Sequence, residues 1–240
     1  MIFWILFGGL LGVALLPYLL FKQKELPEGT NLSSPDFSFV SARLLVDQTV
    51  WDPQTGQAVI RQEIFDTILE EIDAAETFII ADFFLWNPWR GAIESAGELR
   101  PLAEELADAL IQKRIENPQL PILVITDPIN RIYGDQAPAY FDRMVGAGIP
   151  VIFTDLSQLP DSNRLYAPQA WFWSQYLPSE NPEEAARRLP NPFDPDGAKL
   201  TFAQLGRLLY FKANHRKVLV TGYEKAAPRL LIGSLNPADG

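Results

Sequence analysis

Cysteine is absent from this chain of 240 residues, and histidine occurs only once, as His215. Without cysteine, the chain forms no disulfide and no thiolate metal site. Zinc centres that use histidine usually combine it with several other strong ligands, so a single histidine argues against that class as well. The sequence therefore predicts a protein without a bound metal or another cofactor.

Basic residues are also scarce. The chain has 20 Lys and Arg against 30 Asp and Glu, a net charge of -10 and a pI near 4.6. A nucleic-acid binder needs a basic surface for its phosphate contacts, so this class of partner is not expected. The acidity also argues against broad attraction to anionic lipid. With 48% hydrophobic residues, the length suits one sizeable core and is too short for two large domains.

Charge is missing altogether from residues 2–21, which form an apolar run. Roughly 20 apolar residues cross a bilayer core. A cleaved signal peptide is the alternative, but it would begin with a basic residue. We therefore predict a single-pass transmembrane anchor over residues 1–24 and a linker over residues 25–38, with the protein in the cell membrane. Lys22 and Lys24 favour a cytoplasmic globular part by the positive-inside tendency.

Helical and strand-like patterns alternate through the remaining residues, 39–240. Apolar residues recur at helical spacing in some segments, and short apolar runs separate these segments. The expected helices are 61–75, 101–114, 138–145 and 200–210; the expected strands are 39–46, 77–85, 121–126 and 150–154, with a turn at 52–56. This alternation predicts an α/β sandwich with mostly parallel neighbouring strands.

Residues 156–196 interrupt the pattern with seven prolines around Trp171, Phe172, Trp173 and Tyr176. A connection of this length inside a compact domain is usually functional or disordered, and the aromatic residues argue against disorder. Two interpretations stay open. The insertion is either a lid that contacts acyl chains beside a site, or a segment that folds back and buries its aromatic residues against the core.

Chemistry-bearing residues gather in two apolar segments near the end of the chain. In a strand, positions i and i+2 share a face, so His215 and Lys217 are expected to lie together. Pairing with the next apolar run would bring Ser234 and Asn236 beside them. An imidazole can attack phosphorus or protonate a leaving oxygen, and ammonium and amide donors can hold the non-bridging oxygens. The set therefore suits phosphodiester chemistry.

Three further residues are candidates for this site. Asp127 follows the strand that ends at Thr126, which is a common site position in α/β folds, although such residues as often cap a helix or a turn. Asn214 could add a phosphate contact, with surface exposure as the alternative. Asp82 interrupts an apolar strand and either lies at the sheet edge or faces the site.

His215-x-Lys217 followed by Gly233-Ser234-x-Asn236 resembles the H-x-K and G-S-x-N signature of the phospholipase D superfamily. This group includes phospholipases, cardiolipin and phosphatidylserine synthases, a nuclease and non-catalytic members. The resemblance implies an α-β-α sandwich with a mixed, mostly parallel sheet, and phospholipid substrates at a bilayer. It implies His215 as nucleophile or acid, with Lys217 and Asn236 binding phosphate. Gly222 stands where the family usually has Asp, and the gap to Gly-Ser is longer than usual.

The mechanism that the resemblance implies uses two histidines, one to attack phosphorus and one to protonate the departing alkoxide. Because this chain has only one, we expect it to act as the N-terminal half of a two-motif phosphodiesterase or phosphatidyltransferase. Its partner would be a C-terminal lobe with a second motif, or a second copy in a homodimer, and the isolated chain would be inactive. A catalytically inactive scaffold and a superfamily nuclease are the alternatives; the low pI counts against the nuclease.

Overall fold

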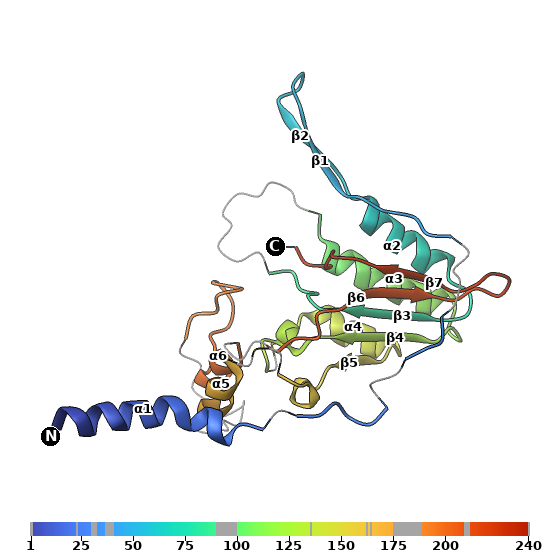
Figure 1. The fold of residues 1–240 in the computed structure, drawn as a ribbon. Coiled ribbons are helices and arrows are strands. Elements are labelled where there is room, and N and C mark those ends of the chain that lie inside the picture. The colour runs from blue at the N-terminus through green and yellow to red at the C-terminus, as the bar shows by residue number, and fades with distance from the viewer. Residues whose placement is uncertain are drawn as a thin grey trace.

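A mixed sheet of five strands forms the centre of the protein (Figure 1). The computed structural model describes residues 2–22, 24–29, 33–36, 41–89, 100–134, 136–161, 163, 165–174, 189–208 and 212–239. The strands are β3 (Ile79–Phe83), β4 (Ile122–Thr126), β5 (Val151–Phe153), β6 (Lys217–Thr221) and β7 (Arg229–Ile232), in the order β5-β4-β3-β6-β7. The α/β class predicted from the alternating pattern is therefore correct.

The sheet is not mostly parallel, however. β4 pairs in parallel with β3 and β5, whereas β6 pairs antiparallel with both β3 and β7. A parallel connection needs a crossover of a dozen or more residues. Residues 222–228 are too few for such a crossover, so β7 must return beside β6 in the opposite direction.

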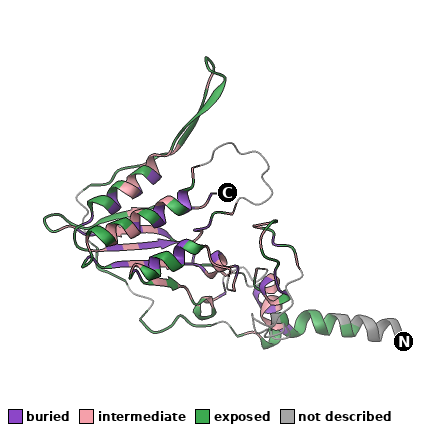
Figure 2. Ribbon diagram, turned by 180° about the vertical axis from the view of Figure 1, so that it is seen from behind, coloured by how far each residue is buried: buried purple, intermediate pink, exposed green. Residues whose placement is uncertain are grey.

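Three helices cover one face of this sheet: α2 (Glu63–Ala74), α3 (Leu102–Glu116) and α4 (Ala139–Gly146) (Figures 1 and 2). Their apolar stripes and the facing strand residues form the core, in which Phe65, Leu106, Met144, Val124 and Leu219 are fully buried. Helical periodicity had predicted each helix, with bounds shifted by a few residues.

The opposite face of the sheet carries no helix within the described residues (Figure 1). Register places Val218 beside Ile232 and Val220 beside Leu230 on this face. Ile232 is 74% exposed and Leu230 58%. The expected sandwich with helices on both sides is thus only half present in the described chain.

A hairpin of β1 (Gln48–Asp52) and β2 (Gln57–Arg61) stands out from the body (Figure 1). The predicted turn at residues 52–56 is correct, since Asp52 accepts hydrogen bonds from the Gln54 amide and the Thr55 hydroxyl. The strand predicted at residues 39–46 is wrong for residues 41–46, which form no strand, and residues 39 and 40 lie outside the described chain. This segment instead leads to Asp47, whose Oδ1 accepts from the amide of Ile64 at the start of α2 (2.8 Å).

The predicted membrane anchor is also wrong. Among the helices that the structure describes, none combines the length and the apolar character needed to cross a bilayer. Helix α1 (Ile2–Leu20) has 19 residues. The predicted single-pass localisation in the cell membrane, with a cytoplasmic globular part, depended on this anchor and is wrong for the same reason.

The described part of the insertion contains helix α5 (Ala167–Ser174), which packs against α1. Gln169 donates to the Ala14 carbonyl oxygen (2.5 Å), and Trp171 meets Phe21 edge to face at 6.0 Å between ring centroids. Tyr176 lies outside the described residues. Trp171 therefore contacts the N-terminal segment and not the core that the second interpretation named, and Trp173 is 50% exposed.

Helix α6 (Phe202–Leu208) confirms the helix predicted from residue 200, although residues 209 and 210 lie outside the described chain. Thr201 and Gln204 form a reciprocal pair at its start: the Thr201 amide donates to Gln204 Oε1 and the Gln204 amide donates to Thr201 Oγ1. This capping box satisfies two amides of the first turn. Two 3₁₀ turns, η1 (Pro128–Arg131) and η2 (Leu156–Gln158), complete the described elements.

Candidate phosphate site

The end of β3, the start of β6 and the end of β7 meet at one end of the sheet. The antiparallel register pairs Phe83 with Lys217, and the amide of Phe84 donates to the Arg216 carbonyl oxygen (2.8 Å). β7 returns to the same end of the sheet, because the Gly233 amide donates to the Lys217 carbonyl oxygen (3.2 Å). The pairing therefore brings the H-x-K and G-S-x-N segments side by side.

Lys217 is a buried cation without a carboxylate partner among the described residues. The residue is 7% exposed, and its Nζ lies 5.0 Å from the ring centroid of Phe84 and donates to the His215 carbonyl oxygen (3.3 Å). Burial lowers the pKa of the Lys217 ammonium. A cation held by an aromatic face and a carbonyl, with no counter-ion, can attract an anion such as phosphate.

His215 lies immediately before β6 and not within it, so strand alternation does not by itself set its direction. Its side chain is exposed, and its ring centroid lies 4.8 Å from that of Phe84. Phe84 thus contacts both His215 and Lys217. The aromatic ring, rather than the strand, brings the imidazole and the ammonium to the same place.

Asn214 and Asp127 are buried, and both form hydrogen bonds with other residues of the chain. Asp127 is 0% exposed, and its carboxylate accepts from the amides of Ile129 (2.8 Å) and Asn214 (2.7 Å). Burial raises the pKa of Asp127, and the two amide hydrogen bonds oppose this rise. The Asn214 carboxamide donates to Asp82 (2.9 Å) and Thr154 (3.1 Å). These contacts fix the backbone that presents His215.

Asp82 belongs to the same supporting network. It is 5% exposed, and its second carboxylate oxygen lies 3.4 Å from Arg216 Nη1. One carboxylate oxygen therefore accepts from the Asn214 carboxamide, and the other pairs with the Arg216 guanidinium. This answers the choice left open by the sequence, since Asp82 is in the central strand β3 and not at a sheet edge.

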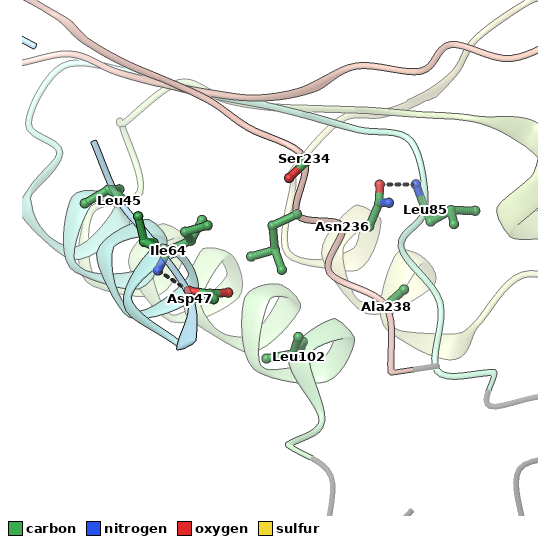
Figure 3. A pocket seen from close by; sticks show the side chains of 10 residues that line it. Leu45, Asp47, Ile64, Leu85, Leu102, Ser234, Asn236 and Ala238 are labelled. Carbon is green, nitrogen blue, oxygen red and sulfur yellow. Dashed lines mark hydrogen bonds between the residues drawn. The ribbon is translucent and has the colours of Figure 1, made fainter. Parts of the chain in front are cut away.

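Asn236 and Ser234 lie in the segment that follows β7 (Figure 3). Asn236 Oδ1 accepts from the Leu85 amide (3.1 Å). This contact fixes the carboxamide, whose Nδ2 remains a donor. Ser234 is exposed. Lys217 and these two residues carry donor groups on two segments whose backbones pair at this end of the sheet, and an oxyanion is bound by donors of this kind.

A pocket of about 580 Å³ adjoins Asn236 (Figure 3). It lies between the first turns of α2 and α3, the segment before the hairpin and the segment after β7. Its apolar lining includes Leu45, Val46, Ile64, Leu85, Leu102 and Leu235. Asp47, Ser234 and Asn236 are its polar members.

Gly222, which replaces the aspartate of the signature, lies at the opposite end of β6 from the site. A Cβ atom there would lie 2.2 Å from Thr77 Oγ1 and 2.5 Å from the ring of Phe78. The Gly222 carbonyl oxygen also accepts from the amides of Glu76 and Thr77. Thr77 and Phe78 therefore leave no space for a side chain at position 222. This position is at the other end of β6 from the proposed phosphate donors.

Two residues of the site were not predicted from the sequence. Phe84 lies within an apolar run, and this pattern predicts a residue of the hydrophobic core. Asn130 is fully buried, and its carboxamide makes four hydrogen bonds with described residues: Nδ2 donates to the Phe84 carbonyl oxygen and to Thr126, and Oδ1 accepts from Trp86 and Asn87. The only sequence signal was a polar residue shortly after the Asp-Pro that ends a buried strand.

Comparison with known proteins found no relative of this chain. No protein-family model, curated protein or solved structure matches the chain.

Proposed function

We propose that this end of the sheet is one half of a phosphodiester-processing site. Lys217 and Asn236 hold the non-bridging oxygens, and His215 acts on phosphorus or on the leaving oxygen. The observation that carries the proposal is the buried Lys217 ammonium, which has no carboxylate partner among the described residues and lies against the same ring as an exposed imidazole. Such a cation is costly to bury unless an anion binds it.

The reaction follows from the groups present. The His215 imidazole attacks phosphorus, a P–N bond forms, and the bond to the leaving alkoxide breaks. Water then releases a phosphomonoester, or an alcohol takes the phosphoryl group as a new ester. The departing alkoxide needs a proton from a second acid, which a lobe with a second motif or a second copy of the chain would supply. The resemblance to phospholipase D enzymes makes phospholipids the first substrates to try.

Binding of phosphate tests the proposal without requiring turnover. Because His215 is the only histidine, its Cε1 proton gives a single resolved imidazole signal in proton NMR. Inorganic phosphate should shift this signal in a saturable way, and Lys217→Met should weaken binding by at least about tenfold, as expected for loss of a charge-assisted hydrogen bond. Lys225→Met, at an exposed lysine in the β6–β7 turn, is the matched control. Equal affinities for the wild type and Lys217→Met would refute the proposal.

An inactive scaffold remains the second candidate, because the chain supplies one imidazole for a mechanism that uses two. Both candidates bind phosphate, so a covalent product separates them. An active half-site should form a phosphoramidate on His215 with an activated aryl phosphodiester, seen as a new phosphorus NMR signal that is lost in His215→Asn. A scaffold should show phosphate binding and no such signal.

A further inference from the structure

The pocket next to Asn236 has a chemical character different from that of the phosphate site. Most of its lining is aliphatic, and it lies between the N-terminal turns of two helices. Helix N-termini often bind anions, so a second phosphate position is the first alternative to consider.

The contacts of the two helices argue against a second phosphate position. Asp47 accepts from the Ile64 amide in the first turn of α2 (2.8 Å), and Asp239 accepts from the Ala103 amide in the first turn of α3 (3.1 Å). Each helix start thus already holds a carboxylate. A phosphate placed here would meet two like charges and fewer amide donors, whereas an apolar group would meet the aliphatic side chains that make up most of the lining.

Asn236 joins the pocket to the phosphate site. Its Oδ1 is held by Leu85, which also lines the pocket, and its residue lies in the segment that returns beside Lys217. A substrate whose phosphate is bound by Lys217 and Asn236 can therefore extend a substituent directly into the pocket.

We infer that the pocket binds the apolar substituent of the phosphodiester, a short aliphatic chain or an aromatic ring, and so selects phosphodiesters that carry one. This inference rests on the proposed function, because the phosphate site supplies the polar end of the same substrate. A volume of about 580 Å³ suits a group of this kind.

The test compares inorganic phosphate, n-hexyl phosphate and n-hexanol, followed by the His215 imidazole signal and by leucine methyl signals. The variants Leu45→Trp, which fills the pocket, and Leu45→Asp, which adds a charge to it, address the site. Leu44→Trp is the matched control, since Leu44 is 86% exposed and does not line the pocket. Leu45 is outside the main core cluster, so both variants should fold.

In the wild type, hexyl phosphate should bind at least about tenfold more tightly than inorganic phosphate, because each fully buried methylene contributes roughly a fourfold gain in affinity. Both Leu45 variants should lose this advantage while binding inorganic phosphate as before, and Leu44→Trp should keep it. Equal affinities of the two phosphates in the wild type, or an advantage that survives in both Leu45 variants, would overturn the inference.

Hexanol distinguishes this failure from a failure of the proposed function. If hexanol shifts the pocket methyl signals in the wild type and not in Leu45→Asp, while no phosphate compound shifts His215, the apolar site stands and the phosphodiester function is wrong. If neither hexanol nor either phosphate binds, both proposals are overturned.

Discussion

The Lys217 ammonium is buried without a carboxylate partner among the described residues. Its pKa in the folded state is lower than the ordinary value of 10.5, because burial disfavours the charged form. Between the lowered pKa and 10.5, the unfolded chain binds more protons than the folded chain. The free energy of unfolding should therefore rise with pH across this window through the contribution of Lys217.

Replacing Lys217 with Met should remove this pH dependence. Relative to Lys217→Met, the wild type should gain stability between pH 7 and pH 10, as measured by urea unfolding at both values. Lys225→Met serves as the control, since an exposed lysine should leave the wild-type trend unchanged. Parallel pH profiles for the wild type and Lys217→Met would contradict the burial of the ammonium.

Gly222 provides a second test at the level of single residues. Gly222→Asp, which restores the aspartate of the signature, should destabilise the protein by about 1–3 kcal/mol, since the new Cβ meets Thr77 and Phe78 at 2.5 Å or less. Gly146→Ala is the control, because nothing lies within 4 Å of its added Cβ. Urea unfolding measures both. A stable Gly222→Asp variant would show that the strand end can open.

Sequence reasoning named the polar residues of the candidate site, which stay a prediction, and missed the aromatic ring that contacts two of them. His215, Lys217, Ser234 and Asn236 follow a spacing that can be read directly. Phe84 cannot be found in this way, since an aromatic residue at the end of an apolar strand has the same pattern whether it packs in the core or contacts a site. Its role depends on which strand lies next to β3, and this is a tertiary property.

At the level of elements, periodicity predicted α2, α3, α4, β3 and β4 because each buries one face or both against the core. The hairpin was not predicted beyond its turn. Its strands are exposed, including Trp51 at 65% and Ile60 at 59%, so the burial that produces a clear alternation is absent. Propensity and the Asp-Pro-x-x-Gly turn were its only signals.

The exposed hairpin should contribute little to the stability of the body. Replacing residues 49–60 with a short Gly-Ser loop, while keeping Asp47 and its hydrogen bond to Ile64, should change the free energy of unfolding by less than about 1 kcal/mol, because surface changes away from buried contacts have small effects. Phosphate binding at His215 should persist. Urea unfolding and the NMR titration measure the two properties; a large loss of stability would show that the hairpin packs on the body.

At the level of the whole molecule, the order of the strands could not be predicted in full. Alternating helices and strands correctly indicated that β3, β4 and β5 are parallel neighbours. Nothing in the local sequence specified that β6 would insert beside β3, on the side opposite β4. That choice depends on which edge of the growing sheet remains open, and it determines where the imidazole and the ammonium lie.

The position of β6 has a consequence for how the protein folds. β3 is the central strand, yet one of its two neighbours is β6, which begins more than 130 residues later in the chain. Closing so long a loop is slow, since its entropic cost is met before the new contacts form. During synthesis on a ribosome, β3 would present a bare apolar edge until Lys217–Thr221 emerged. A nascent chain of this kind is a natural client for molecular chaperones.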